Sequence, residues 1–186
     1  MINRELYMEQ ITPFIDKPFV KVITGIRRCG KSVVLRLIRE ELLRRGVSED
    51  YIIYMNFESF EWIDMKEAKA LYAHIREATK ASGKYYILLD EIQEVTDWEK
   101  AVNAFLVDLD VDIYVTGSNS RLLSSEFSTY LAGRYVAFHI MTLSFREYLL
   151  FHDLPLTISV SDRKTEFLKY LRMGGFPAIH TANYDY

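Results

Sequence analysis

The chain has 186 residues, of which 49% are hydrophobic and 26% charged, and this length fits about one domain. Eight glycines and four prolines exclude a collagen-like or low-complexity chain, and a net charge of −3 excludes a uniformly basic surface for nucleic acid. The single cysteine, Cys29, can form no internal disulfide. Without a signal-peptide pattern or an apolar stretch of about 18 residues, the sequence predicts a cytoplasmic protein that does not associate with membranes.

Apolar runs rich in β-branched and aromatic residues predict strands. They cover residues 19–24, 51–57, 85–89, 111–116 and 135–140. Apolar residues at helical spacing predict helices over 32–45, 65–80 and 161–172, with further helices starting near 98 and 145. Because parallel strands need a crossover and a helix usually supplies it, this alternation predicts an α/β three-layer sandwich around a mainly parallel sheet.

Two of the predicted helix starts carry a capping-box pattern, a serine or threonine followed three residues later by glutamate. These are Thr96 with Glu99 and Ser144 with Glu147. Glycines and a proline at 174–177 end the last helix. We therefore expect a core over residues 1–160, followed by a helix and the start of a further C-terminal region over 161–186.

The most specific motif follows the first predicted strand. Residues 25–32 read Gly-Ile-Arg-Arg-Cys-Gly-Lys-Ser, which fits the phosphate-binding pattern G-x-x-x-x-G-K-[ST], and a chain of this composition has about 0.002 chance matches. The glycines let backbone N–H groups turn toward an anion at the start of the next helix. Lys31 would bind the β- and γ-phosphates, and the Ser32 hydroxyl would be a ligand of Mg²⁺. The expected nucleotide-binding residues are Gly25, Arg28, Cys29, Gly30, Lys31, Ser32 and Val33.

Polar side chains follow the third and fourth predicted strands. Asp90 would hold Mg²⁺ through water, and Glu91 would be the general base that activates the attacking water. Ligands bind at the carboxyl edge of open α/β sheets, where both carboxylates would lie. Ser118 and Asn119 are candidates for contact with the γ-phosphate or the water, with Asn119 favoured for its paired donor and acceptor. A solvated strand end and an ordinary turn are the respective alternatives.

The segments GIRRCGKS, YYILLDEI, YVTGSNSRLLS, LAGRY and LSFREYL, in this order, resemble AAA-type P-loop ATPases of the additional-strand, catalytic-glutamate class. The resemblance is to a bacterial and archaeal group with a GxRRxGKS loop, and it covers about residues 1–180. It implies ATP, Mg²⁺ and hydrolysis, and a fourth strand placed between the first and the third. The group usually carries a C-terminal domain, of which only the start would be present here.

AAA-type sites often need an arginine that neutralises charge on the γ-phosphate, supplied in cis or by a neighbouring subunit. The resemblance suggests Arg134 for this role, with Arg121 second. An arginine acting in trans would require a homo-oligomer or a partner protein. A surface ion pair is the alternative for either side chain.

A basic segment is the main argument for a nucleic-acid partner. Residues 21–45 hold eight lysines and arginines against two glutamates. A solvated helix face explains the same pattern, so nucleic acid is the weaker expectation. Cys29, beside Lys31 and Arg28 at a helix N-terminus, is expected to have a lowered thiol pKa.

These features predict Mg²⁺-dependent ATP binding and hydrolysis. The alternative is an ATP-gated switch with little turnover, acting through an attached or partner domain, which shares every motif. A P-loop kinase or GTPase ranks last, because the sequence has no N-K-x-D segment to read guanine and because Asp90 and Glu91 at the end of a buried strand favour water over another phosphoryl acceptor.

Overall fold

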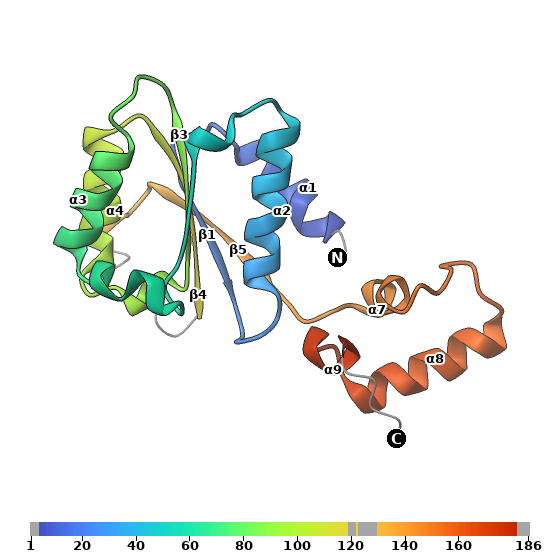
Figure 1. The fold of residues 1–186 in the computed structure, drawn as a ribbon. Helices are drawn as coiled ribbons and strands as arrows, with labels where there is room; N and C mark the ends of the chain where they lie inside the picture. Colours follow the sequence, from blue (N-terminus) through green and yellow to red (C-terminus); the bar gives the residue numbers. More distant parts are fainter. Residues whose placement is uncertain (1–3, 119–121, 123–129, 182–186) are drawn as a thin grey trace.

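The computed structural model describes residues 4–118, 122 and 130–181 (Figure 1). Parallel strands form one sheet in the order β2-β3-β4-β1-β5. The strands are β1 (Val20–Gly25), β2 (Ile52–Asn56), β3 (Tyr85–Asp90), β4 (Val111–Ser118) and β5 (Tyr135–Ile140). Because β4 lies between β1 and β3, the carboxyl ends of these three strands are neighbours, in the order that the family resemblance implies.

Helices cover both faces of the sheet and complete three layers (Figure 1). One face carries α1 (Glu5–Ile11) and α2 (Lys31–Arg44), and the other carries α3 (Ala68–Ala78) and α4 (Trp98–Asp108). Short 3₁₀ helices lie at Thr12–Phe14, Glu49–Tyr51, Phe60–Met65 and Ile92–Glu94. The predicted α/β three-layer sandwich is therefore confirmed.

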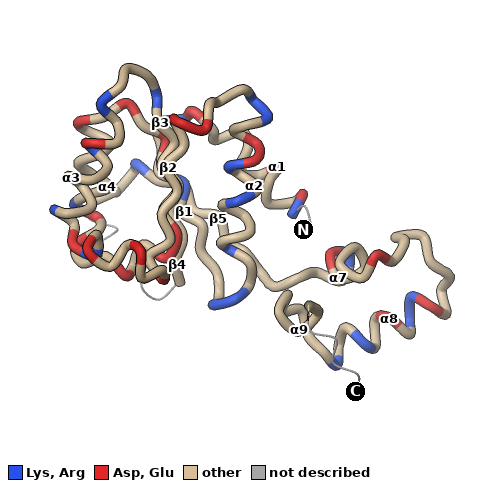
Figure 2. The backbone as a smooth tube through the Cα atoms, in the orientation of Figure 1, with Lys and Arg blue, Asp and Glu red and all other residues tan. Residues whose placement is uncertain are grey.

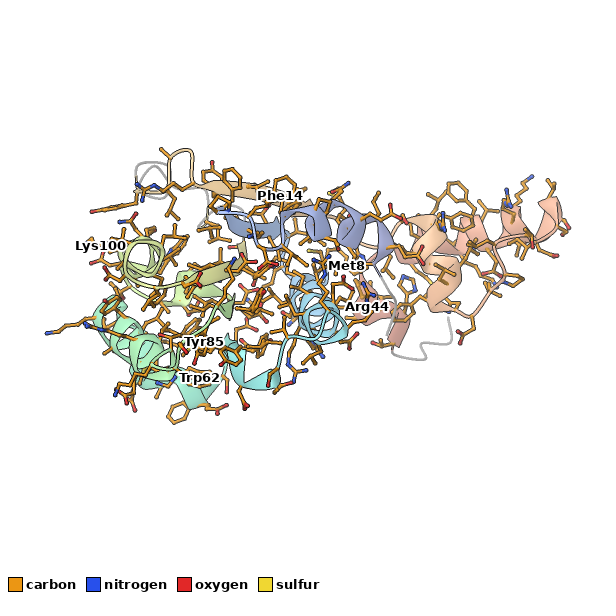
Figure 3. All side chains as sticks on the ribbon, turned by 90° about the horizontal axis from the view of Figure 1, so that it is seen from above. Met8, Phe14, Arg44, Trp62, Tyr85 and Lys100 are labelled. Carbon is orange, nitrogen blue, oxygen red and sulfur yellow. The ribbon has the colours of Figure 1, made fainter. Side chains whose placement is uncertain are left out.

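Two hydrophobic cores, one on each face of the sheet, hold the layers together. In β1, Val22 packs with Phe105 on the side of α3 and α4, while its neighbour Ile23 packs with Ile38 of α2. Figure 3, seen from above, shows side chains filling the space between the sheet and each helix layer. Every residue of β1 and β3 is buried, so packing fixes where both strands end.

The chain leaves the sheet after β5 and forms α7 (Phe145–Phe151), α8 (Val160–Met173) and α9 (Pro177–Thr181) on the side of α1 and α2 (Figure 1). The Leu143 N–H donates to the Gly175 carbonyl over 2.7 Å, and His152 Nε2 lies 3.1 Å from His180 Nδ1. None of the residues of α8 is buried. Across the described ranges, no helix combines the length and the apolar character that a membrane span requires.

The helix starts differ from the predictions in informative ways. At α7, Ser144 and Glu147 form the expected capping box. The expected box at Thr96 is wrong, because α4 begins after Asp97, whose backbone is left-handed (φ 55°) and whose side chain makes no capping bond. The helix expected over 65–80 begins only at Ala68. Neither α1 nor α9 was predicted.

Candidate active site

A tight loop joins β1 to α2 at the carboxyl edge of the sheet. At Gly25 a Cβ atom would lie 2.4 Å from the Ile140 carbonyl oxygen and 2.7 Å from the Cys29 sulfur, so only glycine fits there. Gly30 precedes α2 with a φ of 107°, a conformation that other residues rarely adopt. These two glycines give the loop its path, as the motif predicts.

The loop leaves several N–H groups available to a ligand. The N–H groups of Arg27, Arg28, Gly30 and Ser32 make no backbone hydrogen bond with any residue in the described part of the chain. They precede or open α2, where the helix dipole favours an anion. Arg27 and Arg28 are exposed at the loop's tip, and Arg27 forms an ion pair with Glu58 over 3.2 Å. This arrangement is suited to bind phosphate groups.

The lysine of the motif is brought to the strand-end carboxylates. The Lys31 side chain is only 3% exposed, and its Nζ lies 3.4 Å from Oε1 of Glu91. Nζ also donates to the Ile26 carbonyl over 3.4 Å. Lys31 and Glu91 come from α2 and from the end of β3, so the sheet order brings together residues that are 60 positions apart in sequence. Lys31 and Glu91 therefore lie next to each other at the carboxyl edge of the sheet.

Asp90 is fully buried and held by two hydroxyl groups. The Tyr54 hydroxyl donates to Oδ2 over 3.1 Å, and the Thr116 hydroxyl donates to Oδ1. Burial, reinforced by Asp90, raises the pKa of Tyr54 to about 12, so the phenol keeps its proton. A carboxylate has about four acceptor positions, which leaves Asp90 able to accept from a further donor such as metal-bound water.

Glu91 has a left-handed backbone (φ 55°), which is strained for a non-glycine residue. Its N–H donates to the Thr116 hydroxyl oxygen over 3.0 Å, and its Oε2 accepts from Nε2 of Gln93 over 2.5 Å. Thr116 therefore joins both carboxylate residues to β4. These contacts over-determine the position of Glu91, as strained residues at functional sites require.

The prediction for the cysteine is wrong. Cys29 is fully buried, and this burial raises the pKa of its thiol, more than Lys31 and Arg4 lower it. Its carbonyl oxygen accepts from Nη1 of Arg4 over 3.1 Å. The side chain is a packing element beneath the loop and is not exposed as a thiolate.

Arg4 joins three segments at the site, although the sequence analysis did not single it out. The residue is 2% exposed. Besides Cys29, its guanidinium donates to the Met141 carbonyl over 2.7 Å, and Nε lies 2.7 Å from Oε1 of Glu147 in α7 as an ion pair. A Cβ on Gly30 would lie 3.3 Å from Nη1, so the guanidinium also borders the phosphate loop.

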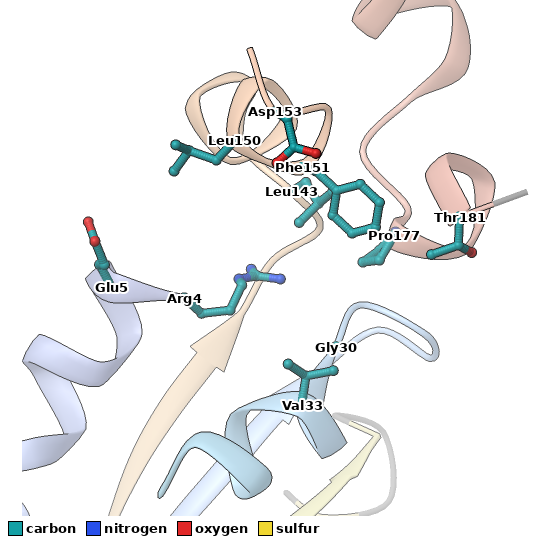
Figure 4. A pocket seen from close by; sticks show the side chains of 10 residues that line it. All are labelled: Arg4, Glu5, Gly30, Val33, Leu143, Leu150, Phe151, Asp153, Pro177 and Thr181. Atoms are coloured by element: carbon teal, nitrogen blue, oxygen red, sulfur yellow. The ribbon is translucent and has the colours of Figure 1, made fainter. Parts of the chain in front are cut away.

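A cavity of about 620 Å³ opens beside this loop (Figure 4). Gly30 and Val33 form one wall and Arg4 and Glu5 another, while the remaining wall belongs to the segment after β5. In Figure 4 the labelled Phe151 and Pro177 lie across the cavity from Gly30 and Val33. The wall after β5 consists of Leu143, Leu150, Phe151, Asp153, Pro177 and Thr181.

Arg134, the first of the two predicted arginines, is not brought to this edge. Arg134 lies at the opposite edge, where its carbonyl accepts from the Val20 N–H over 2.8 Å and its guanidinium donates to Asn103. Strand β1 separates it from the phosphate loop by about 17 Å. Asn119 and Arg121 lie outside the described residues. Ser118 pairs with Gly25 in the β4–β1 register, next to the loop.

The basic segment does not form a continuous cationic surface. Lys21 is fully buried in an ion pair with Asp112. Arg44 and Arg45 both bond to Glu41 and lower its pKa to about 2. Figure 2 accordingly shows basic and acidic residues interspersed along this part of the chain, with the basic loop between β1 and α2 as the local exception.

A parallel sheet covered by helices, with a glycine-bounded anion loop, a buried lysine and paired strand-end carboxylates, defines a P-loop nucleotide-binding protein. A family model described as "AAA domain" matches residues 17–149. The chain therefore belongs to the AAA-type P-loop ATPase family, as its motifs suggest.

The curated relatives carry no assigned activity. An uncharacterized protein of Haemophilus influenzae is 43% identical over 184 residues, which is 98% of this chain and 46% of that protein. The uncharacterized protein MJ1544 of Methanocaldococcus jannaschii is 35% identical over 184 residues, 96% of this chain and 39% of that protein. The chain thus spans less than half the length of the curated relatives it matches.

Solved structures share the fold at low sequence identity. AMPPCP-bound DnaA from Aquifex aeolicus matches with a TM-score of 0.61 and 16% identity, over 97% of this chain and 60% of that one. The Aeropyrum pernix ORC1 protein in complex with DNA matches with a TM-score of 0.59 and 16% identity, over 97% and 58%. These matches support the AAA-type architecture.

Proposed function

We propose that this chain binds ATP with Mg²⁺ and hydrolyses the bond between the β- and γ-phosphates. The observation that carries the proposal is the 3.4 Å approach of Lys31 Nζ to Oε1 of Glu91. It joins the phosphate loop to a carboxylate that can serve as general base. Catalysis would consist mainly of positioning and charge stabilisation.

The phosphates would lie in the loop between β1 and α2. The N–H groups of Arg28, Gly30 and Ser32 supply neutral donors, and Lys31 supplies a charge. Phosphate oxygens would draw Lys31 away from Glu91, because the triphosphate carries several negative charges. The base would then be released only when ATP is bound.

The donor set also fits Mg²⁺, which prefers hard oxygen ligands and keeps several waters. The Ser32 hydroxyl would bind the ion directly, and Asp90 would bind it through water. Bound Mg²⁺ would neutralise charge that develops on the phosphate oxygens. Tyr54 and Thr116 fix the orientation of the Asp90 carboxylate from the two flanking strands.

The cavity beside the loop suits the nucleoside. Its volume of about 620 Å³ is within the range of small-ligand sites, and it touches the loop at Gly30. Val33 and Phe151 offer apolar surface to a planar base. The proposal therefore places the triphosphate and the nucleoside on the two sides of Gly30.

The test combines binding and turnover. We expect the wild type to be stabilised by ATP with Mg²⁺, and Lys31→Ala to lose most of this stabilisation in a thermal-shift assay. Glu91→Gln should retain the shift and lose hydrolysis by about 10²-fold or more, measured as phosphate release. Equal thermal shifts of wild type and Lys31→Ala would reject the phosphate site.

The switch with little turnover is the second candidate. It is favoured by the placement of Arg134 at the far edge of the sheet, which leaves this arginine unable to reach phosphates bound in its own subunit. A switch would bind ATP and show the same slow phosphate release in wild type and Glu91→Gln.

A further inference from the structure

Gln93 contacts Glu91 from the 3₁₀ helix that follows β3, and the proposed function does not use it. Its Nε2 donates to Oε2 of Glu91 over 2.5 Å, while Oε1 of the same carboxylate faces Nζ of Lys31. The two oxygens of Glu91 thus have different partners. The Gln93 amide, which contacts Oε2, belongs to the 3₁₀ helix. The Lys31 ammonium group, which faces Oε1, is expected to move when phosphate binds.

The orientation of the Gln93 amide follows from its surroundings. A carboxylate only accepts hydrogen bonds, so the nitrogen must face Glu91 and the oxygen must point away. That oxygen is buried and has no hydrogen-bond partner in the described part of the chain. It lies so close to Gly117 that a Cβ there would approach to 2.1 Å. Leaving an acceptor unpaired is unfavourable, so the fold keeps this amide at a cost in stability.

We infer that Gln93 is a positioning residue that holds Oε2 of Glu91 and reserves Oε1 as the oxygen that takes the proton. This inference rests on the proposed function. Once Lys31 turns to the phosphates, Oε1 is the oxygen freed, whereas Oε2 stays bonded to Gln93. The amide therefore selects both the basic atom and its direction.

A water oxygen forms a bond to the γ-phosphorus while one water proton passes to Oε1 of Glu91. The bond from the γ-phosphorus to the bridging oxygen breaks, and its electron pair stays on ADP. Glu91 then returns the proton to solvent or to the phosphate product. Oε2 carries no proton at any stage and keeps its bond to Gln93.

The test uses Gln93→Met, which preserves length and removes the donor, and Gln93→Leu, which preserves much of the volume and also cannot donate. We expect kcat for ATP hydrolysis to fall at least about tenfold in both, because misplacement of a catalytic group by about 1 Å can cost up to 10²-fold. The KM and the Kd for ATP should stay within about twofold of wild type, since the phosphates are bound elsewhere. The matched control is Gln10→Met on the exposed side of α1, with unchanged kcat.

The possible failures can be told apart. If wild type hydrolyses ATP and Glu91→Gln does not, but both Gln93 variants keep the wild-type kcat, the inference is overturned and the function stands. A parallel loss of kcat, ATP affinity and melting temperature in both variants would also overturn it, because that pattern describes a structural residue. If wild type shows no hydrolysis, the proposed turnover and this inference fail together.

Discussion

At the scale of single residues, Thr116 connects the two strands on which the proposed chemistry depends. Its hydroxyl donates to Asp90 and accepts from the Glu91 N–H, and the side chain is fully buried. Both neighbours lose a partner when this oxygen is removed. A buried polar group left unpaired costs more than an average hydrogen bond contributes.

We therefore expect Thr116→Val, which has nearly the same shape, to lower the free energy of unfolding by about 1–3 kcal/mol and to reduce ATP hydrolysis strongly. Thr116→Ser retains the hydroxyl and should stay close to wild type in both. Urea unfolding and phosphate release measure the two effects. A fully active Thr116→Val protein would show that neither carboxylate needs this hydroxyl.

Some residues of the site can be predicted from the sequence, and others become visible only in the structure. Lys31, Asp90 and Glu91 stand out in the sequence because a motif or a strand end marks them. Thr116 lies inside a buried strand and Tyr54 inside the partly buried edge strand β2, and each hydroxyl acts through a partner on the neighbouring strand β3. Only the strand order reveals which residue they face, and no local spacing encodes it.

At the scale of elements, the two predicted capping boxes separate a sequence pattern from a formed cap. At α7 the Ser144 hydroxyl accepts from the Glu147 N–H over 3.3 Å, and Glu147 bonds back to the Ser144 N–H over 2.8 Å. At α4 the Thr96 carbonyl instead accepts from the Ala68 N–H, and Thr96 forms a bridge to the start of α3. Tertiary pairing has overridden the local signal there.

This contrast gives a paired prediction. Ser144→Ala should lower the free energy of unfolding by about 1 kcal/mol, the usual effect of losing an N-cap. Thr96→Ala, at an exposed position that does not cap α4, should stay within about 0.5 kcal/mol of wild type. Equal losses measured by urea unfolding would contradict the assignment of the two helix starts.

The contact between His152 and His180, at the ends of α7 and α9, is expected to depend on pH. Burial, followed by the charge of His180, lowers the pKa of His152 below its ordinary value of 6.5, and nearby Glu166, Asp153 and Lys169 modify this effect. Below pH 6.5, His152 binds a proton in the unfolded chain more readily than it does in the folded chain. The contribution of neutral His152 to the free energy of unfolding is therefore complete above pH 6.5 and decreases as the pH falls toward the pKa of His152 in the folded protein.

We expect the free energy of unfolding, measured by urea titration, to decrease by less than about 1 kcal/mol between pH 7.5 and pH 5.5, because the His152 side chain is exposed enough for solvent to screen it. His152→Gln should reduce this dependence, whereas His74→Gln on α3 should retain it. If His152→Gln leaves the pH dependence unchanged, other groups cause it.

Most elements of the fold follow from the sequence, because buried parallel strands are continuous apolar runs with few alternatives. The exceptions are short or depend on distant partners. Helix α1 has only seven residues, and the Arg4 guanidinium at its start donates to the carbonyls of Cys29 and Met141, which lie far away in sequence. Helix α9 has five residues and is placed by His180, whose Nε2–H donates to the Gly174 carbonyl over 2.8 Å and whose Nδ1 lies 3.1 Å from Nε2 of His152, the C-cap of α7.

At the scale of the whole molecule, the two edges of the sheet carry different parts of the proposed machinery. The phosphate loop and Glu91 lie at the carboxyl edge, and Arg134 lies at the other. An arginine at that position can assist hydrolysis only in a neighbouring subunit. The activity per subunit would then depend on assembly.

We therefore expect Arg134→Ala and Lys31→Ala to be inactive separately and to regain ATPase activity when mixed. In the mixture, an intact loop meets an intact arginine from the other variant. Phosphate release at increasing protein concentration measures this complementation. An Arg134→Ala protein as active as wild type at every concentration would remove this arginine from the mechanism.

The hydrogen bond from Arg4 to the Cys29 carbonyl in the phosphate loop bears on which residues a nucleotide-binding fragment of this protein must contain. The stretch matched by the family model begins at residue 17 and ends at 149, so it contains every residue expected to touch phosphate or metal. It omits Arg4, and with it Phe151 and Pro177 of the cavity wall. A fragment limited to residues 17–149 would keep every motif. It would lose the Arg4 hydrogen bond to the loop and part of the wall of the cavity proposed for the nucleoside. We expect such a fragment to bind nucleotide weakly, because these contacts are missing and not because its phosphate loop is defective.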